Sequence, residues 1–525
     1  MGKLLRGAFW GVVLAVSVVS AYSADKYFRV GSGTYLSGTS WYADEQRTEQ
    51  SSVPNYEDTA IFQSTNNGTA WVTQIDTYLG NLIASKGMSN INLGRELINS
   101  GVPANFQIYG KLSVQLSDEY TNFGFRTSFD DAEGTVGVEL RVGSIDIGTE
   151  VYGGGSYDKY GQAQLTLDYR DARLSSSKVF VDGDVKMGGG LAGVSAAALM
   201  YVGADLLEVG GTVTFSRNGV GYNNIHFLKS CTFETGGLIS TNTTSGNTDF
   251  LIANDFNTEF VSSVVLKNAA GTDYQFIGLI SDDGNGRTDI TAIKAVTNVV
   301  MEGEGTQRIY STIKGGVGLT ARQSGTYSVK SGKLIFDNSS IAADYRLAVL
   351  SLEGGKFGAA HYDSAQAGIA YFKSAELISG GLAYENFKEH NSVETGVSDK
   401  IVVSDTLKKT GAGKIAVDFS DRSGNSLDLS DFVLAEDAQS IEMWVEILAA
   451  GDIEGFDMSD ANSDFYGEGL KNGIAVFRWI ESSGGGYGLE VGFAQVPEGA
   501  TTAAAMALAA FSLAFLRRRL YNVLE

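Results

Sequence analysis

The stretch Phe180-Val181-Asp182-Gly183-Asp184-Val185-Lys186-Met187-Gly188 decides the fold. Apolar and polar residues alternate in it, and glycine and aspartate interrupt it, which is typical of short β-strands joined by tight turns. Related versions of the same unit occupy residues 142–148 and 201–210. Repetition of one strand-and-turn unit predicts coils that stack on one another.

The spacing of these units separates a solenoid from a sandwich. Val142, Val181 and Val202 stand 39 and 21 residues apart, which fits coils of about 20 residues with one coil skipped. Less regular glycine steps follow at Gly332, Gly355, Gly381 and Gly413. The sequence therefore predicts a parallel β-helix, in which each coil buries its apolar side against the next. A glycine-rich sandwich, or several sandwich domains, is the alternative.

The composition agrees with an all-β body. The chain has 525 residues, of which 43% are hydrophobic, with 66 glycines and only 3 prolines, and no amphipathic helix of convincing length interrupts the short alternating segments. The lone Cys231 excludes an internal disulfide framework. We therefore expect packing and backbone hydrogen bonds to stabilise the body, with Cys231 as a small buried apolar residue.

Residues 1–23 have the order of a signal peptide. A positively charged start precedes an apolar stretch over residues 8–19 and a small-x-small site. We expect cleavage after Ser23, with Ala21 and Ala24 as alternatives, and therefore an exported protein.

The C-terminal residues 495–520 form a second targeting segment. The motif Val496-Pro497-Glu498-Gly499 precedes an apolar run over residues 501–516 and the cluster Arg517-Arg518-Arg519. As a helix this run spans roughly 24 Å, which makes it a short transmembrane helix against a hydrocarbon core of roughly 30 Å. The arginines would then stay on the cytoplasmic side. An ordinary C-terminal membrane anchor is one interpretation.

The same tripartite order resembles the PEP-CTERM sorting signal of Gram-negative bacteria. Gly499 stands where that family usually has a second proline. The resemblance implies processing by an exosortase-like protease, transient anchoring in the membrane, and delivery to the cell surface or extracellular matrix of a Gram-negative-type bacterium.

A broader resemblance covers parts of the body. The N-terminal residues Trp41, Asp58, Phe62 and Trp71, with their neighbours, and the phrase Leu407-Lys408-Lys409-Thr410-Gly411-Ala412-Gly413-Lys414-Ile415 resemble autotransporter-like, repeat-containing surface proteins. This resemblance implies a right-handed parallel β-helix and no particular activity.

We expect three parts between the two targeting segments. An N-terminal capping module would occupy residues 24–100, and a β-solenoid body would follow over residues 101–435. The periodicity ends after that, and aromatic residues become dense between Trp444 and Phe493. Because the last coil of a solenoid exposes unpaired edges, residues 436–494 are predicted to form a small aromatic-rich C-terminal β cap.

Charge excludes one class of partner. The formal net charge is −22, and the predicted signal peptide and tail are both positively charged, so the body between them is more acidic still. A surface of this kind repels nucleic acid, whose phosphates require basic patches. Charge alone identifies no partner, and the partner expected for an exported surface protein is an extracellular polysaccharide or matrix.

Catalytic motifs are scarce. The histidines His226, His361 and His390 lack the spacing of a zinc site, and the Gly-Lys pairs lack the Ser or Thr of a phosphate-binding loop. Carboxylate chemistry stays open, because a glycosidase needs only two acids at a set separation. The sequence nominates no catalytic residue.

One segment has the spacing of calcium ligands. Asp282, Asp283, Asn285 and Asp289 supply oxygen atoms around two glycines, and Ser281 replaces the usual first aspartate. Hard oxygen ligands at such intervals can surround Ca²⁺, which is the only cofactor that the sequence suggests. An Asn/Gly turn without metal is the alternative.

Two classes of function remain. The first is a non-enzymatic exported surface or extracellular-matrix protein, such as an adhesin, a spacer or a biofilm component. The second is a secreted polysaccharide-active enzyme, a lyase or a glycosidase, on the same scaffold.

Overall fold

The computed structural model describes residues 24–28, 41–43, 45–46, 49–63, 68–72, 76–93, 103–117, 120–127, 136–152, 161–171, 174–188, 196–216, 223–241, 250–254, 259–283, 293–311, 322–341, 346–363, 366–385, 387, 399–431, 436, 441, 443–482 and 485–495. The elements in these residues are β-strands and two short 3-10 helices, η5 (Leu429–Asp431) and η6 (Ala461–Ser463). The prediction of an all-β protein is confirmed.

Most strands pair in parallel with the equivalent strands one coil earlier and one coil later, and the pairings define three faces. Face 1 contains β1 (Asp25–Phe28), β3 (Thr59–Gln63), β12 (Val185–Gly188), β15 (Val213–Ser216), β18 (Leu238–Thr241), β21 (Asp273–Ile277), β24 (Thr306–Tyr310), β26 (Lys333–Asp337), β31 (Ile415–Asp418) and β34 (Phe465–Glu468). Face 2 contains β5 (Asp76–Leu79), β11 (Leu174–Val181), β14 (Leu206–Val209), β17 (Thr232–Thr235), β20 (Val261–Leu266), β23 (Val296–Met301) and β25 (Thr326–Val329). Face 3 contains β4 (Gly68–Val72), β8 (Tyr120–Thr127), β10 (Gly161–Asp168), β13 (Ala196–Val202), β16 (Asn223–Phe227), β19 (Phe250–Asn254), β22 (Leu279–Ser281) and β28 (Ile369–Phe372).

Longer strands bend at a corner and contribute to two faces. They are β6 (Asn81–Leu93), β7 (Ala104–Leu116), β9 (Val136–Val151), β27 (Val349–Ala359), β29 (Ser374–Ala383), β30 (Lys400–Lys409) and β33 (Val445–Glu454). The remaining strands are β2 (Trp41–Tyr42), β32 (Leu427–Asp428), β35 (Leu470–Lys471), β36 (Ile474–Glu481) and β37 (Tyr487–Ala494).

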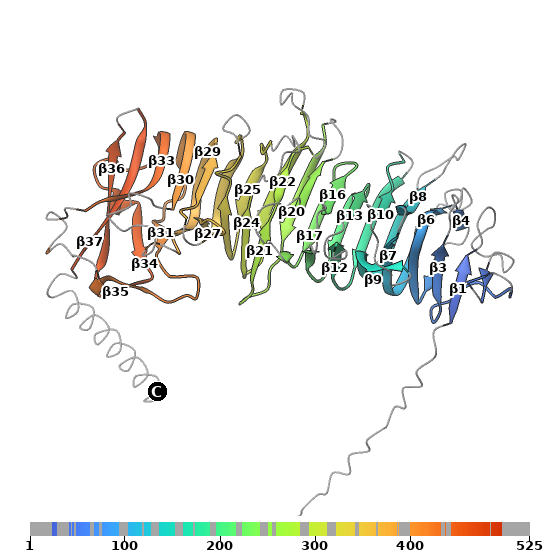
Figure 1. Ribbon diagram of the computed structural model, residues 1–525. Coiled ribbons are helices and arrows are strands. Elements are labelled where there is room, and N and C mark those ends of the chain that lie inside the picture. Colours follow the sequence, from blue (N-terminus) through green and yellow to red (C-terminus); the bar gives the residue numbers. More distant parts are fainter. Residues whose placement is uncertain are drawn as a thin grey trace, which may run out of the picture.

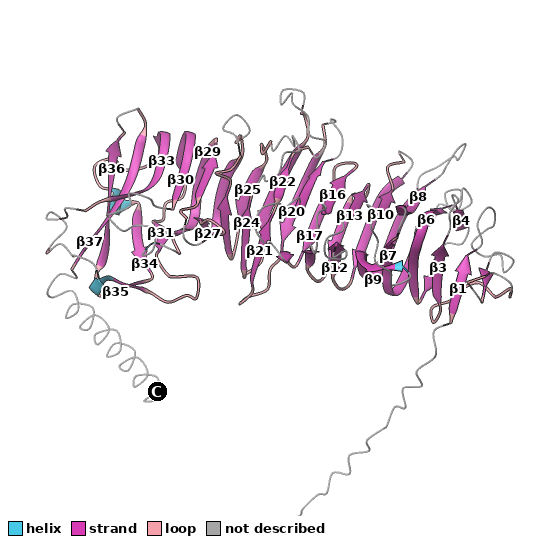
Figure 2. Ribbon diagram, viewed as in Figure 1, coloured by secondary structure: helices cyan, strands magenta, loops and turns pink. Residues whose placement is uncertain are grey.

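The strands form one elongated stack. They follow one another in chain order from β1 at one end to β36 and β37 at the other (Figure 1). Strands, joined by loops and turns, are the main element of the body that the structure describes (Figure 2). One large, mostly parallel sheet that turns around a common core is consistent with a β-solenoid.

The core is built from ladders of inward-facing side chains. On face 2 one ladder runs through Val142, Val181, Val209, Thr235, Leu266, Met301 and Val329, each paired with the next across a coil and each almost fully buried. Burial of such a valine or leucine side chain contributes roughly 1.5–3 kcal/mol. Thr235 is the polar member, and its hydroxyl donates to the carbonyl of Gly237 (3.2 Å).

The predicted coil length was wrong in the first half of the body. Val142 pairs directly with Val181, 39 residues away, and no coil is skipped. Val202 lies on another face, where it pairs with Leu167 and Phe227. The corner loops differ in length from coil to coil, so sequence spacing does not report the register.

Two of the four predicted glycine steps, Gly332 and Gly355, are equivalent positions in successive coils. Gly381 instead pairs with Lys356 and with Ala416, three residues after Gly413. Lys333, which follows Gly332, pairs with Lys356, which follows Gly355. Gly332 has a positive φ of 59°, a conformation that glycine adopts readily. Glycine therefore marks the same corner in successive coils.

Antiparallel strands occupy both ends of the described stack. At the N-terminal end β1 lies between the antiparallel β2 and the parallel β3. At the C-terminal end β37 pairs antiparallel with both β33 and β36. No helix in the described part of the chain is long and apolar enough to cross a membrane. The apolar run predicted to be a transmembrane helix lies outside it.

Candidate functional site

The predicted targeting residues lie almost entirely outside the described residues. This applies to Ala21, Ser23, Val496, Pro497, Glu498, Gly499, Arg517, Arg518 and Arg519. Ala24 is described and exposed, and its carbonyl accepts a hydrogen bond from the backbone amide of Thr59 (2.9 Å). Signal cleavage and sorting stay predictions.

Asp282 and Asp283 are the two predicted calcium ligands that the structure describes, whereas Asn285 and Asp289 lie outside it. Both aspartates directly follow β22 and are buried. In the Asp282 carboxylate, Oδ1 accepts from the amide of Thr297 (2.8 Å), and Oδ2 accepts from the amide (2.9 Å) and hydroxyl (2.7 Å) of Ser324. This carboxylate therefore ties three chain segments together.

Burial raises the pKa of Asp282 to about 6, although its hydrogen bonds favour the charged form. Among the described residues, no group of three or more His, Cys, Asp or Glu side chains could hold a metal ion. Calcium binding by the whole predicted loop stays a prediction, because half of its ligands lie beyond that part of the chain.

The histidines and the cysteine occupy separate places. The His226 ring stacks on Tyr201, with ring centroids 5.1 Å apart, and burial lowers its pKa to about 4. His361 Nε2 lies 3.9 Å from Asp337 Oδ2, and His390 lies outside the described residues. Cys231 is buried, and burial raises the pKa of its thiol to about 12, so little reactive thiolate forms at neutral pH.

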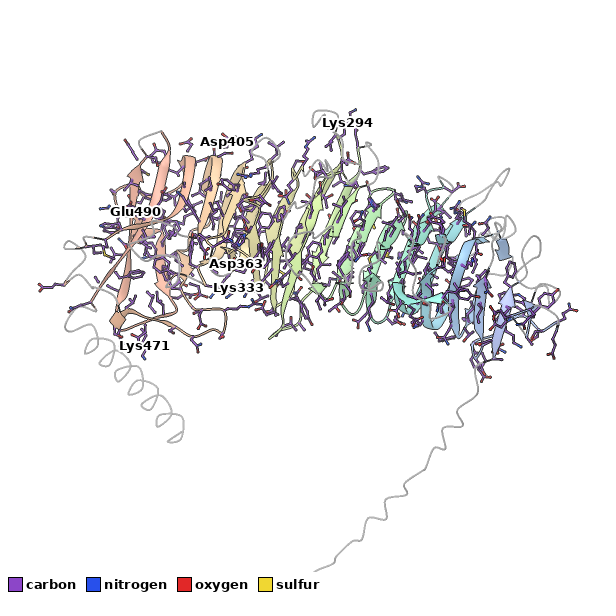
Figure 3. All side chains as sticks on the ribbon, in the orientation of Figure 1. Lys294, Lys333, Asp363, Asp405, Lys471 and Glu490 are labelled. Atoms are coloured by element: carbon purple, nitrogen blue, oxygen red, sulfur yellow. The ribbon has the colours of Figure 1, made fainter. Side chains whose placement is uncertain are left out.

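A charge cluster of Asp273, Arg308, Lys333, Glu385 and Arg422 lies on the outer side of face 1. Arg308 is only 2% exposed, and its neighbour Ile309 belongs to the core. The Arg308 guanidinium donates to Asp273 at 2.7 and 3.1 Å and to Glu385 Oε2 at 2.6 Å. Lys333, labelled in Figure 3, donates to Glu385 Oε1 (3.0 Å), and Arg422 donates to Asp273 Oδ2 (3.0 Å).

Other ion pairs also join coils. Lys356 Nζ lies 2.7 Å from Asp418 Oδ2 and also contacts Glu468. On face 2, Lys330 pairs with Glu302 (2.9 Å). The hydrogen bonds and positive charge of Lys356 hold the pKa of Asp418 below its ordinary value despite partial burial. A carboxyl group with a lowered pKa stays ionised at neutral pH and is therefore a poor proton donor.

Asp337 and His361 form the arrangement closest to acid–base chemistry. Burial raises the pKa of Asp337, while its Oδ1 accepts a hydrogen bond from the amide of Ser339 (2.9 Å). The rings of Tyr310 and Tyr362 lie beside this pair, with centroids 6.4 Å apart and Tyr362 also packed against the His361 ring. A buried acid beside a histidine has the residue types of a general acid and base.

An amide patch lies on the outer side of face 3, and sequence analysis did not identify it. The patch consists of Asn90, Asn92, Asn122, Gly124, Arg126 and Gln164, on β6, β8 and β10. The available signal was the alternation of polar and apolar residues in these strands. Because isolated asparagines also occur in turns, the alternation of polar and apolar residues was not enough to identify a patch.

Comparisons with protein-family models, with curated proteins and with solved structures gave no match.

Proposed function

We propose that the chain is a non-enzymatic exported surface or extracellular-matrix protein, acting as an adhesin, a spacer or a biofilm component. The observation that carries the proposal is that acids on face 1 are paired with basic side chains of other coils. The buried Glu385 and Asp418 and the partly exposed Asp273 pair with arginine or lysine side chains of other coils, so these charges stabilise an elongated stack. The carboxylate oxygens of these three acids all accept hydrogen bonds from groups within the protein.

We also propose a handedness for the coils and a role for the last strands. The coils wind right-handed, because connections between parallel strands of one sheet are almost always right-handed. The antiparallel strands β36 and β37 form a C-terminal cap, supported by the rings of Phe456, Phe465, Phe477 and Trp479, which lie within about 6 Å of their neighbours.

The targeting segments supply the destination. After export the short C-terminal transmembrane helix holds the protein in the membrane, an exosortase-like protease reads the motif at residues 496–499, and the body reaches the cell surface or extracellular matrix. The acidic surface keeps it hydrated and soluble there.

One experiment separates this function from the enzymatic alternative. Purified mature protein is incubated with neutral and acidic polysaccharides, and both retention and reducing-end release are measured. Binding without product supports the surface role. Release of product shows an enzyme.

The second candidate function is a polysaccharide-active enzyme, a lyase or a glycosidase, and the Asp337–His361 pair favours it. If the panel reveals product, Asp337→Asn should abolish its release while retention persists. Glu353→Gln, which changes an acid on face 2, is the matched control.

A further inference from the structure

We propose that the amide patch is a binding site for a neutral, hydroxyl-rich saccharide chain. The inference rests on the proposed surface or matrix function and adds the site and the ligand class to it.

The patch faces away from the core. On β8 the side chains of Phe123 and Phe125 belong to the core and are at most 1% exposed. Alternate residues of a strand point to opposite sides, so Asn122, Gly124 and Arg126 lie on the outer side. In register, Asn122 pairs with Gln164.

Three polar atoms in the patch lack hydrogen-bond partners although they are buried. They are Asn92 Oδ1, Asn122 Oδ1 and Arg126 Nε. Asn122 is only 6% exposed, and its Nδ2 donates to the hydroxyl of Tyr120 (3.1 Å), which fixes the amide and leaves the oxygen free. A buried polar atom without a partner costs about 1–3 kcal/mol. A ligand that draws these side chains outward and satisfies their polar atoms would recover that cost.

Polar atoms also converge above the backbone of Gly124. A Cβ atom on Gly124 would lie 2.5 Å from Asn90 Oδ1 and 3.0 Å from Arg126 Nε. Asn90 and Thr166 pair with Gly124 on the two neighbouring coils. The side chains of Asn90 and Arg126 therefore fill the space that a side chain on Gly124 would take, and they bring an acceptor and a donor together at one point.

The pattern of donors and acceptors suits hydroxyl groups. A sugar hydroxyl can donate to an amide oxygen and accept from a guanidinium. The amides are neutral. Although burial opposes it, Arg170 and, to a smaller extent, the positive charge of Arg126 hold the pKa of the Asp168 carboxyl below its ordinary value. The acidic body repels anionic polysaccharides, which favours a neutral chain. Equivalent positions recur about every 4.8 Å from coil to coil, so an extended ligand can cross β6, β8 and β10.

Calorimetric titration of the full mature chain tests the site. The probes are maltohexaose, cellohexaose and laminarihexaose, with an oligogalacturonate as the acidic probe. At least one neutral probe should bind, and Asn122→Ala and Arg126→Met should each weaken its binding by about tenfold or more. Gln107→Ala, an outward amide on face 2, is the matched control and should leave binding unchanged.

The proposal is overturned if no neutral probe binds, if the acidic probe binds more tightly, or if the patch variants bind as well as the unaltered chain. Thermal unfolding shows whether each variant is folded, and Asn92→Ala replaces Asn122→Ala if the latter unfolds. Binding that is insensitive to the patch leaves the surface function standing. Release of product would instead contradict that function.

Discussion

Arg308 and Glu385 are 77 residues apart in sequence, yet Nη1 of the arginine lies 2.6 Å from Oε2 of the glutamate, and both side chains are 2% exposed. The pair spans several coils, because β24 carries Arg308 and Glu385 follows β29. A buried ion pair is strongly destabilising to break, since the remaining charge loses its partner and cannot reach water.

The first prediction concerns this pair. Glu385→Ala should lower the free energy of unfolding by about 3–5 kcal/mol, measured by urea denaturation with circular dichroism. The double variant Arg308→Met/Glu385→Leu should lose less, because it also removes the buried guanidinium, which in the single variant keeps only Asp273 as a carboxylate partner. Lys330→Ala, which removes an exposed ion pair, is the control and should have a much smaller effect. Equal losses in the single variant and the control would show that burial of the Arg308–Glu385 pair does not matter.

The second prediction concerns the corner glycines. A Cβ atom on Gly143 would lie 2.4 Å from the carbonyl oxygen of Tyr109, whereas one on Gly413 meets nothing within 4 Å. Gly143→Ala should therefore destabilise the protein by about 1–3 kcal/mol, and Gly413→Ala should be neutral or slightly stabilising. Thermal unfolding of both variants measures the difference. A neutral Gly143→Ala would contradict the close approach of these two coils.

The third prediction concerns the pH dependence of stability. The pKa of His226 is lowered by burial to about 4, against an ordinary value of 6.5. Between these values the unfolded chain binds a proton that the folded chain does not, so stability falls as the pH falls. The free energy of unfolding is therefore unaffected by His226 protonation above pH 6.5. Below that pH, protonation of His226 in the unfolded chain lowers it by roughly 1.4 kcal/mol per pH unit down to about pH 4.

His226→Phe should remove this contribution while keeping the stack on Tyr201. Urea denaturation at several pH values gives the two profiles, and their difference isolates His226 from the other titrating groups. Parallel profiles would exclude the predicted shift.

The fourth prediction concerns calcium. The oxygen atoms of Asp283, Asn285 and Asp289 predict a melting temperature that rises when Ca²⁺ is added, and Asp283→Ala/Asp289→Ala should abolish the rise. Glu259→Ala, at an exposed acid, is the control and should keep the response. A response that persists in the double variant would place the ion elsewhere.

The all-β class and the glycine corners were predictable, because both depend on local residue preferences. The turn at Gly332 and its equivalent at Gly355 could be read from the repeated Gly-Lys pair. The direct pairing of Val142 with Val181 could not be predicted, because the length of one coil could not be derived from the sequence. Corner loops of different length change the spacing between paired residues but leave the stacking of the strands the same.

Neither cluster on the outer faces could be predicted. Arg422 reaches Asp273 across 149 residues, and no local pattern encodes that contact. The amide patch depends on the register of β6, β8 and β10, which places Asn90, Gly124 and Thr166 side by side. Parallel stacking brings together residues whose separation in sequence varies, so such sites appear only once the register is known.

The fifth prediction concerns the sorting motif. Residues 496–499 read Val-Pro-Glu-Gly, and Gly499 stands where the PEP-CTERM signal, which this segment resembles, usually has a second proline. If a processing protease reads this motif in an extended conformation, Gly499→Pro should increase surface delivery, because proline restricts the chain to that shape before binding.

Deletion of residues 496–499 should retain the protein in the membrane fraction. Fractionation of cells and quantitative immunoblotting of the released body measure both effects. Ala500→Pro is the matched control, since it adds a proline one residue beyond the motif. Unchanged release after the deletion would show that the tail acts only as an anchor.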